Sequence, residues 1–106
     1  MSSRVRIALA SFSFFSVCAA VVAADAPRSG ADVYRDFCVV CHGGGWQGAP
    51  VANDAIEWEA RVSAGLDAML MNTKQGLNAM PPMGTCMNCS DEELKQAIGE
   101  MLPEKK

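Results

Sequence analysis

One short motif, the run Cys38-Val39-Val40-Cys41-His42, constrains this chain more than any other feature. Two thiols three residues apart can each add to one of the two vinyl groups of a haem, and the next residue then places an imidazole on the iron. His42 is the one histidine in the 106 residues. The motif therefore predicts one covalently attached haem, held by Cys38 and Cys41, with His42 as an axial ligand of the iron.

The first 24 residues have the layout of a secretory signal peptide. A positive start at Arg4 and Arg6 is followed by an apolar run, and the small residues Val22-Ala23-Ala24 stand where a signal peptidase cleaves. The run is short and rich in serine for a spanning helix, which needs about 20 apolar residues. We therefore expect residues 1–24 to be a removed signal peptide, residues 25–106 to form one mature domain, and no permanent membrane anchor to remain.

Two alternatives for the amino-terminal segment stay open. The segment could be retained as a membrane anchor, or Cys18 could carry a lipid after cleavage. The residues before Cys18, Ser16 and Val17, are not the small pair that lipid attachment favours. Export remains the interpretation that fits the whole segment, and it permits disulfides in the mature chain.

The predicted mature domain is acidic. It keeps seven of the nine Lys and Arg residues and all twelve Asp and Glu residues, which gives a formal charge of −5. Such a domain is a poor match for nucleic acid, whose backbone is itself negative. A protein partner with a basic or mixed-charge docking face is the expectation instead, because opposite charge accelerates encounter.

The cysteine pattern leaves two rivals to haem attachment. A chain of 82 residues buries little surface and needs a disulfide, a metal or a cofactor. The pairs Cys38/Cys41 and Cys86/Cys89 could bind one zinc ion, but 44 residues separate the pairs, against about 15 to 20 in a zinc ribbon. The first pair could be a catalytic dithiol, but the chain lacks the period-two apolar alternation of a thioredoxin-like fold.

Apolar spacing and capping residues predict an all-α fold of about four short helices. The last helix is the clearest, because Ser90 and Glu93 form a capping box before a stripe of apolar residues. The four expected helices run from the Ser29 cap to Gly43, from Asn53 or Asp54 to Gly65, from Leu66 to Gln75 before Gly76, and from Ser90 to Pro103. The second helix is expected to face inward with Ile56, Ala60 and Val62. The buried stripe of the last helix is expected to consist of Leu94, Ala97, Ile98, Met101 and Leu102.

The iron needs a second axial ligand or an open site, and methionine is the leading candidate because no second histidine exists. Met101 belongs to the apolar stripe of the last helix, and Met69 and Met71 are expected to pack in the core from the third. Met80 precedes two prolines in a loop between helices, where reduced backbone freedom can hold a thioether in place. Met80 is therefore the predicted ligand, and Met83 remains its competitor.

The segment from Ser29 to Met101 resembles the class I cytochromes c, and most closely the cytochrome c5 subgroup. The resemblance is carried by Gly30-Ala31-Asp32-Val33-Tyr34, the Cys38–His42 motif, Gly48-Ala49-Pro50, Trp58 with Arg61, Ala79-Met80-Pro81-Pro82 and the run from Cys86 to Leu94. It implies a small all-α fold around one haem c, ligated by His42 and Met80. It also implies a disulfide between Cys86 and Cys89.

The resemblance further places Trp58 and Arg61 near the haem propionates, where a guanidinium can bind a carboxylate through two hydrogen bonds. From its position alone, Arg61 could equally be a solvated helix residue. The chain departs from the subgroup at Met83 and Thr85, where its members more often have Lys and Gly. Because position 83 is itself a methionine, Met83 remains a second candidate for the axial ligand beside Met80.

The function that follows is outer-sphere transfer of single electrons by a carrier that is not an enzyme. The resemblance implies a bacterial periplasmic protein in a respiratory chain, with redox proteins such as a cytochrome reductase and a terminal oxidase or reductase as partners. Methionine ligation favours a higher potential than ligation by two histidines. The alternative is a haem-based sensor of small ligands or a weak peroxidase, which would require a readily displaced methionine.

Overall fold

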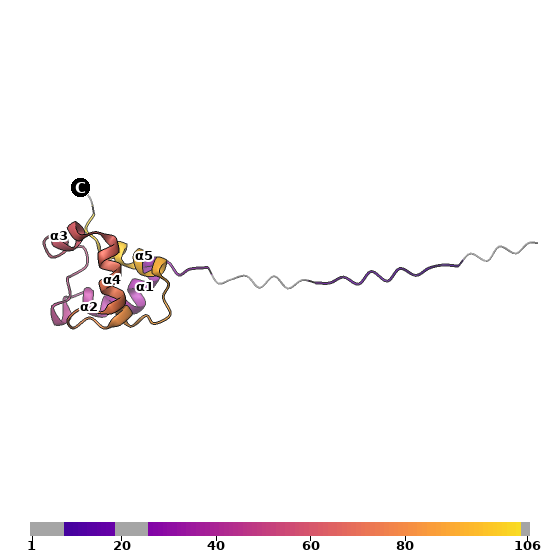
Figure 1. Ribbon diagram of the computed structural model, residues 1–106, viewed down its shortest axis with the longest axis horizontal. Helices are drawn as coiled ribbons and strands as arrows, with labels where there is room; N and C mark the ends of the chain where they lie inside the picture. Colours follow the sequence, from indigo (N-terminus) through magenta and orange to yellow (C-terminus); the bar gives the residue numbers. More distant parts are fainter. Residues whose placement is uncertain (1–7, 19–25, 105–106) are drawn as a thin grey trace, which may run out of the picture.

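The computed structural model describes residues 8–18 and 26–104, and its folded part is built from short helices (Figure 1). The predicted cleavage site at Val22-Ala23-Ala24 lies outside the described residues. Residues 8–18 have no regular secondary structure and are exposed. Within the described ranges, no helix is long and apolar enough to cross a membrane.

The four predicted helices are present, which confirms the all-α expectation. The first is continuous from Gly30 to His42 but contains a π-helical turn, so that it has three parts. In chain order the elements are α1 (Gly30–Val33), the π segment η1 (Tyr34–Cys38), α2 (Val39–His42), the 3-10 turn η2 (Trp46–Gly48), α3 (Ala55–Ala64), α4 (Leu66–Gln75), the 3-10 turn η3 (Pro82–Thr85) and α5 (Asp91–Met101).

Side-chain caps start α1, α3 and α5 where the sequence predicted. The Ser29 hydroxyl accepts a hydrogen bond from the Asp32 backbone N–H, and the Asp54 carboxylate caps α3 in the same way. Ser90 and Glu93 form both halves of the capping box at α5. Each such cap contributes about 1 kcal/mol, because it satisfies N–H groups that have no partner inside the helix.

The π turn η1 was not predicted, and it changes which way the first helix points its side chains. The Val39 N–H donates to the carbonyl of Tyr34, five residues back instead of four. The wider turn rotates the residues after it away from the face that carries Val33. Val33 is fully buried in the core beside α5, whereas Phe37, Cys38 and Cys41 line a cleft.

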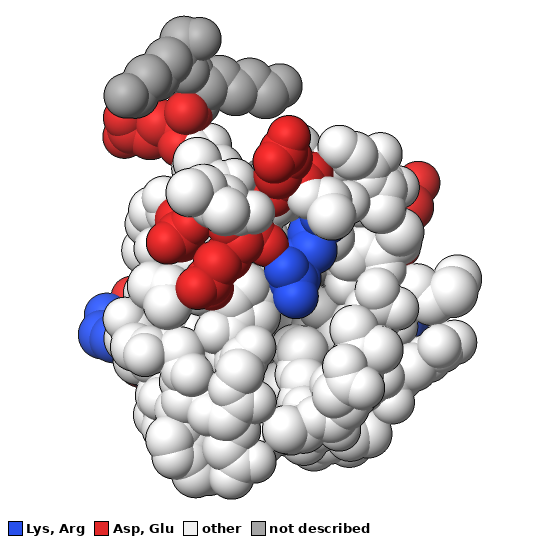
Figure 2. Space-filling view, turned by 90° about the vertical axis from the view of Figure 1, so that its left-hand side faces the viewer, with Lys and Arg blue, Asp and Glu red and all other residues white. Residues whose placement is uncertain are grey.

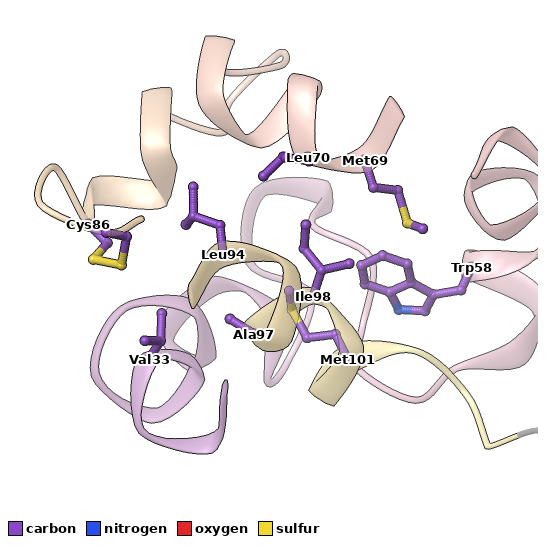
Figure 3. Packing of buried hydrophobic residues seen from close by; sticks show 10 residues of the cluster. Val33, Trp58, Met69, Leu70, Cys86, Leu94, Ala97, Ile98 and Met101 are labelled. Carbon is purple, nitrogen blue, oxygen red and sulfur yellow. A yellow bond between two sulfur atoms is a disulfide. The ribbon is translucent and has the colours of Figure 1, made fainter. Parts of the chain in front are cut away.

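Helix α5 is the centre of the core and packs against α1 and α4 (Figure 3). Its stripe of Leu94, Ala97, Ile98 and Met101 is buried as predicted, and Leu102 is partly buried. The crossing with α1 is close because Gly30 lies against the backbone of Gln96: a Cβ at Gly30 would be 2.6 Å from the Gln96 carbonyl carbon. The remaining core side chains are Val33, Trp58, Met69, Leu70, Cys86 and Cys89.

Two expectations about inward-facing residues are wrong. On α3, Ile56 is 86% exposed, Val62 is 43% exposed, and Ala60 also faces solvent. The one large side chain that this helix buries is Trp58, which projects toward the core (Figure 3). On α4, Met71 is 58% exposed whereas Met69 is buried, because positions two apart point to different sides of a helix.

Candidate functional site

The residues that the sequence singled out for haem binding surround one cleft of about 210 Å³, between the first helix, α3, α4 and the loop that follows α4. The cleft-lining residues include Cys38, Cys41, His42, Trp58, Arg61 and Met80. The first three come from a single helix and Met80 from a loop nearly forty positions away in the chain. The fold thus brings together every predicted haem-site residue; the pair Cys86/Cys89 lies elsewhere.

His42 is held in a defined orientation at the end of α2. Its side chain is buried, and its Nδ1 lies 2.9 Å from the carbonyl oxygen of Pro50. A backbone carbonyl can only accept, so Nδ1 carries the hydrogen and Nε2 keeps the lone pair that a metal needs. The loop that supplies this carbonyl is itself fixed, because the Ala52 N–H donates to the His42 carbonyl at 2.8 Å.

Pro50 is a functional residue to which the sequence analysis assigned no role. Its contribution is a main-chain oxygen, and no side-chain pattern encodes where a carbonyl will point. The available signal was the Gly-rich loop from Gly43 onward, which allows the chain to return to the helix that it has just left. Gly45, at φ +78°, is one of the residues that make this return.

The two thiols of the motif lie in an apolar wall. Cys38 and Cys41 are both half-buried, and neither takes part in a disulfide. Burial, with a smaller effect of the neighbouring Cys41, raises the pKa of the Cys38 thiol to about 11. A catalytic dithiol needs a lowered pKa to supply a thiolate at neutral pH, so the environment is opposite to the one that dithiol chemistry requires.

The zinc alternative does not fit the arrangement of the four cysteines. Cys86 and Cys89 are joined by a disulfide, with their Cα atoms 5.4 Å apart. Among residues 8–18 and 26–104, no group of three or more His, Cys, Asp or Glu side chains is placed to share a metal ion.

A tight turn positions Met80. The backbones of Leu77 and Met80 exchange hydrogen bonds of 3.1 and 2.9 Å across the turn. Gly76, at φ +81°, precedes this turn, and a Cβ there would be 2.9 Å from the Met80 carbonyl oxygen and 3.0 Å from the Pro82 nitrogen. Only glycine fits at this position. The sequence predicted Gly76 as the end of a helix, but it did not predict this close approach to the backbone of Met80 and Pro82.

The two candidate methionines occupy different environments. Met80 lines the cleft, and its methyl carbon lies near Gly84, 3.5 Å from where a Cβ would be. Met83 is partly buried and packs against the core cluster. Met80 is therefore the one of the two that shares the cleft with His42.

Trp58 and Arg61 line the cleft from α3 and contact each other. The Trp58 indole N–H donates to the carbonyl of Val51 at 2.8 Å, and its ring centroid lies 6.1 Å from that of His42. The Arg61 guanidinium carbon lies 6.0 Å from the centroid of the Trp58 ring, while one of its N–H groups donates to the Glu57 carbonyl. The indole N–H of Trp58 is thus already hydrogen-bonded, whereas the Arg61 guanidinium retains N–H groups that could donate to a further acceptor. The contact of Trp58 and Arg61 with the haem propionates stays a prediction.

A partly buried ion pair, Arg28 with Glu93, lies against the disulfide that follows the Met80 loop. Arg28 donates to the Glu93 carboxylate from Nε at 2.7 Å and from its backbone N–H at 2.9 Å, and its Nη2 lies 3.4 Å from the Cys89 sulfur. The hydrogen bond from the Arg28 side chain, assisted by the backbone N–H groups of Ser90 and Arg28, lowers the pKa of Glu93 to about 2. No local sequence pattern predicts this pair, because its two residues lie 65 positions apart in the chain.

The arrangement fits a covalently bound haem. One wall of the cleft carries two thiols and an imidazole whose Nε2 is free to bind iron, and a thioether lies in the loop that closes the cleft. Imidazole and thioether are ligands that haem iron takes in electron carriers. The lining is largely apolar, which suits a porphyrin ring.

Comparisons with known proteins identify relatives of this chain. The family described as "Cytochrome C oxidase, cbb3-type, subunit III" matches residues 25–99. Cytochrome c5 of Azotobacter vinelandii is 53% identical over 76 residues, which cover 70% of this chain and 92% of the relative.

Two solved structures extend the similarity to the fold. A mono-haem ferrocytochrome c from Shewanella putrefaciens is 42% identical with a TM-score of 0.67, over 74% of this chain and 95% of its own. The second structure is an electron transfer complex of nitrite reductase with cytochrome c. The matched chain is 34% identical with a TM-score of 0.66, over 73% of this chain and 94% of its own.

Proposed function

The chain belongs to the class I c-type cytochromes, near cytochrome c5, and on this premise we propose that it transfers electrons in the respiratory chain of a bacterial periplasm, with Cys38 and Cys41 binding its haem covalently and His42 and Met80 ligating the iron. Its relatives identify it as a small electron carrier with one covalent haem c. The finer assignment is supported by one observation above all, which is that these four side chains line a single cleft.

Each residue has a separate task in this proposal. The haem supplies a one-electron change at its iron. Cys38 and Cys41 would hold the ring through thioether bonds, and the Pro50 carbonyl, which accepts from His42 Nδ1, would leave Nε2 available to the iron. The turn from Leu77 to Met80 delivers the thioether from the opposite segment of the chain.

With His42 and Met80 both bound to it, the iron would have no position left for a substrate, so the proposed protein would be a carrier and not an enzyme. Its partners would be redox proteins, such as a cytochrome reductase and a terminal oxidase or reductase. The similar cytochrome c solved in an electron transfer complex with nitrite reductase supports a protein partner of this kind.

The ligand assignment is tested with a matched pair of methionine variants. The protein is exported by a host that has haem-attachment machinery, and the near-infrared absorption band of a methionine–iron(III) bond is measured in the oxidised state. Met80→Ala should abolish this band, and Met83→Ala should retain it. The reverse result would assign the ligand to Met83, and a wild-type protein without the band would favour the sensor or peroxidase alternative.

Covalent attachment and export are tested on the same sample. Acid–acetone extraction should leave the haem with the polypeptide, and the Cys38→Ala/Cys41→Ala variant should release it. Amino-terminal sequencing should begin at Asp25 if residues 1–24 are a cleaved signal peptide. An amino terminus at Met1 in membrane fractions would instead indicate a retained anchor.

A further inference from the structure

The carbonyl that orients His42 belongs to a peptide group whose other end is hydrogen-bonded as well. The Pro50 oxygen lies 2.9 Å from His42 Nδ1, and the N–H of the same peptide, on Val51, donates to Oε2 of Glu57 at 2.7 Å. A carboxylate, a peptide and an imidazole therefore form one chain of two hydrogen bonds. This chain begins at Glu57, which is exposed in the first turn of α3 and does not line the cleft, and it ends at the histidine nitrogen opposite Nε2.

Further hydrogen bonds fix the peptide in this chain. The next carbonyl, that of Val51, accepts from the Trp58 indole N–H at 2.8 Å and from the Asp54 backbone N–H at 3.1 Å. The N–H that follows, on Ala52, donates to the His42 carbonyl at 2.8 Å. Because the backbone groups along this stretch all have partners, the peptide cannot rotate without breaking several hydrogen bonds. The carboxylate thus acts on a peptide of defined orientation.

The acceptor of the Val51 N–H is a carboxylate, which makes this chain different from an ordinary pair of backbone hydrogen bonds. Hydrogen bonds to an ionised acceptor are roughly twice as strong as neutral ones. They also polarise the peptide, so that its carbonyl oxygen becomes a better acceptor, by about 10–30% for each bond in the chain. A stronger acceptor at Nδ1 draws that hydrogen away from the ring, and the imidazole becomes a more basic ligand through Nε2.

We propose that Glu57 is a positioning residue that acts through the Pro50–Val51 peptide on His42, and that its charge lowers the reduction potential of the haem. A more basic imidazole stabilises iron(III) relative to iron(II), which gives the direction of the effect. The hydrogen stays on Nδ1 in both oxidation states, so the step moves one electron from a redox partner to the iron and no proton. The proposal rests on the electron-carrier function with His42 as an axial ligand.

Charge at a distance would shift the potential in the same direction, so the test needs a control for it. Figure 2 shows acidic side chains gathered on the upper part of one face, at the height where Figure 1 places α3. Removing a negative charge from this face favours the added electron through space alone. Glu59 is the control, because it is exposed on the same helix and accepts a hydrogen bond from the Ser63 hydroxyl through its main-chain carbonyl and not its carboxylate.

The experiment measures the midpoint potential of the holoprotein by equilibration with a mediator of known potential. Glu57→Gln and Glu59→Gln both change the formal charge of the predicted mature domain from −5 to −4, and glutamine keeps an oxygen that can accept from the Val51 N–H. Glu57→Gln should raise the equilibrium constant for reduction about threefold, which is about 28 mV at 59 mV for each tenfold change. Glu59→Gln should change that constant by less than about 1.5-fold.

Two further measurements separate the hydrogen-bond chain from a through-space effect. The Debye length falls from about 10 Å at 0.1 M salt to about 3 Å at 1 M, so a shift caused by an exposed charge at a distance should shrink, whereas the Glu57→Gln shift should persist. In the diamagnetic reduced protein, the NMR signal of the His42 Nδ1 proton should move upfield in Glu57→Gln, because its hydrogen bond is weaker. The same signal should keep its position in Glu59→Gln.

The outcomes that would overturn the proposal are distinct. Equal shifts in the two glutamine variants, a Glu57→Gln shift that disappears at 1 M salt, or an unmoved His42 proton would each leave charge at a distance as the explanation. Glu57→Ala removes the charge and the acceptor together and should raise the potential at least as far, so an unchanged potential there would overturn the proposal even if Glu57→Gln failed to fold.

The wild type separates this proposal from the function on which it rests. A holoprotein without a reversible one-electron couple would overturn the electron-carrier function, and the role of Glu57 with it. A normal couple that responds equally to the changes at Glu57 and Glu59 would overturn the role of Glu57 alone.

Discussion

Replacing Gly30 by alanine should destabilise the protein, although the same change in a helix usually stabilises. Gly30 is the first residue of α1 and is buried where α1 crosses α5. A Cβ there would overlap the carbonyl oxygen of Gln96 and would lie 2.6 Å from its carbonyl carbon and 3.0 Å from its Cβ. Two of these three atoms belong to the backbone, so the contact cannot be relieved by a change of rotamer.

The magnitude follows from two opposing effects. Alanine is favoured over glycine by up to about 1 kcal/mol inside a helix, and by less at a first position. Overpacking that forces backbone to move costs about 1–3 kcal/mol. Here α5 is fixed by its capping box and its buried stripe, so the two helices must separate. We expect the free energy of unfolding to fall by about 1–2 kcal/mol, and the midpoint temperature to fall by about 4–8 °C for each kcal/mol.

Gly99 provides the control on the other helix of the same pair. It lies exposed in α5, and a Cβ there would meet nothing within 4 Å. Gly99→Ala should therefore raise the free energy of unfolding by about 0.5–1 kcal/mol. Both variants are measured as holoprotein by urea unfolding followed by far-ultraviolet circular dichroism. A Gly30→Ala protein as stable as the wild type would refute the close approach of α1 and α5.

Two further predictions concern the segment after Met80. Thr85 has φ +69°, where a β-branched residue is strained by about 1–2 kcal/mol. Thr85→Gly should therefore raise the free energy of unfolding, measured by urea unfolding, by about 0.5–1 kcal/mol once the flexibility of unfolded glycine is subtracted. Thr73→Gly, inside α4, should lower it, and equal effects of the two changes would contradict the strain argument. Glu93 has its pKa lowered from 4.5 to about 2 by Arg28, so its stabilising contribution is complete above about pH 5 and is lost as the pH falls toward 2. The difference in unfolding free energy between wild type and Glu93→Gln should shrink over that window, and a difference independent of pH would contradict the assignment.

The elements of the fold were readable from the sequence because their signals are local. Ser90 and Glu93 form a capping box whose two halves are three residues apart, and the buried stripe of α5 follows at helical spacing. Gly65 and Gly76 end helices where positive φ is needed. The motif that ends at His42 likewise carries its chemistry within five residues.

The features that the sequence analysis missed depend on contacts between distant segments. Ile56 looked as apolar as a core residue, but tertiary packing, and not hydrophobicity, decided that α3 buries Trp58 alone. The π turn at Tyr34 shifts the face of the first helix in a way that regular spacing cannot express. The Pro50 carbonyl acts on His42 through its main chain, which its side chain does not reveal.

The position of Met80 is the result of anchors at both ends of an irregular segment. At one end, Gly76 and the turn from Leu77 fix the backbone; at the other, the Cys86–Cys89 disulfide is covered by Arg28. Between the anchors the chain has no α-helix or strand to set its register, only the 3-10 turn η3, and residues 83–85 all have positive φ. Because the sequence has a methionine on each side of two prolines, it does not determine whether Met80 or Met83 is the axial ligand. The distance between the two anchors decides which of the two thioethers reaches the cleft. Inserting or deleting one residue between Pro82 and Cys86 should therefore displace the Met80 thioether from the cleft more than any single side-chain substitution in that segment. The reason is that a change in length alters the span between the two anchors, and with it which side chain lies opposite His42.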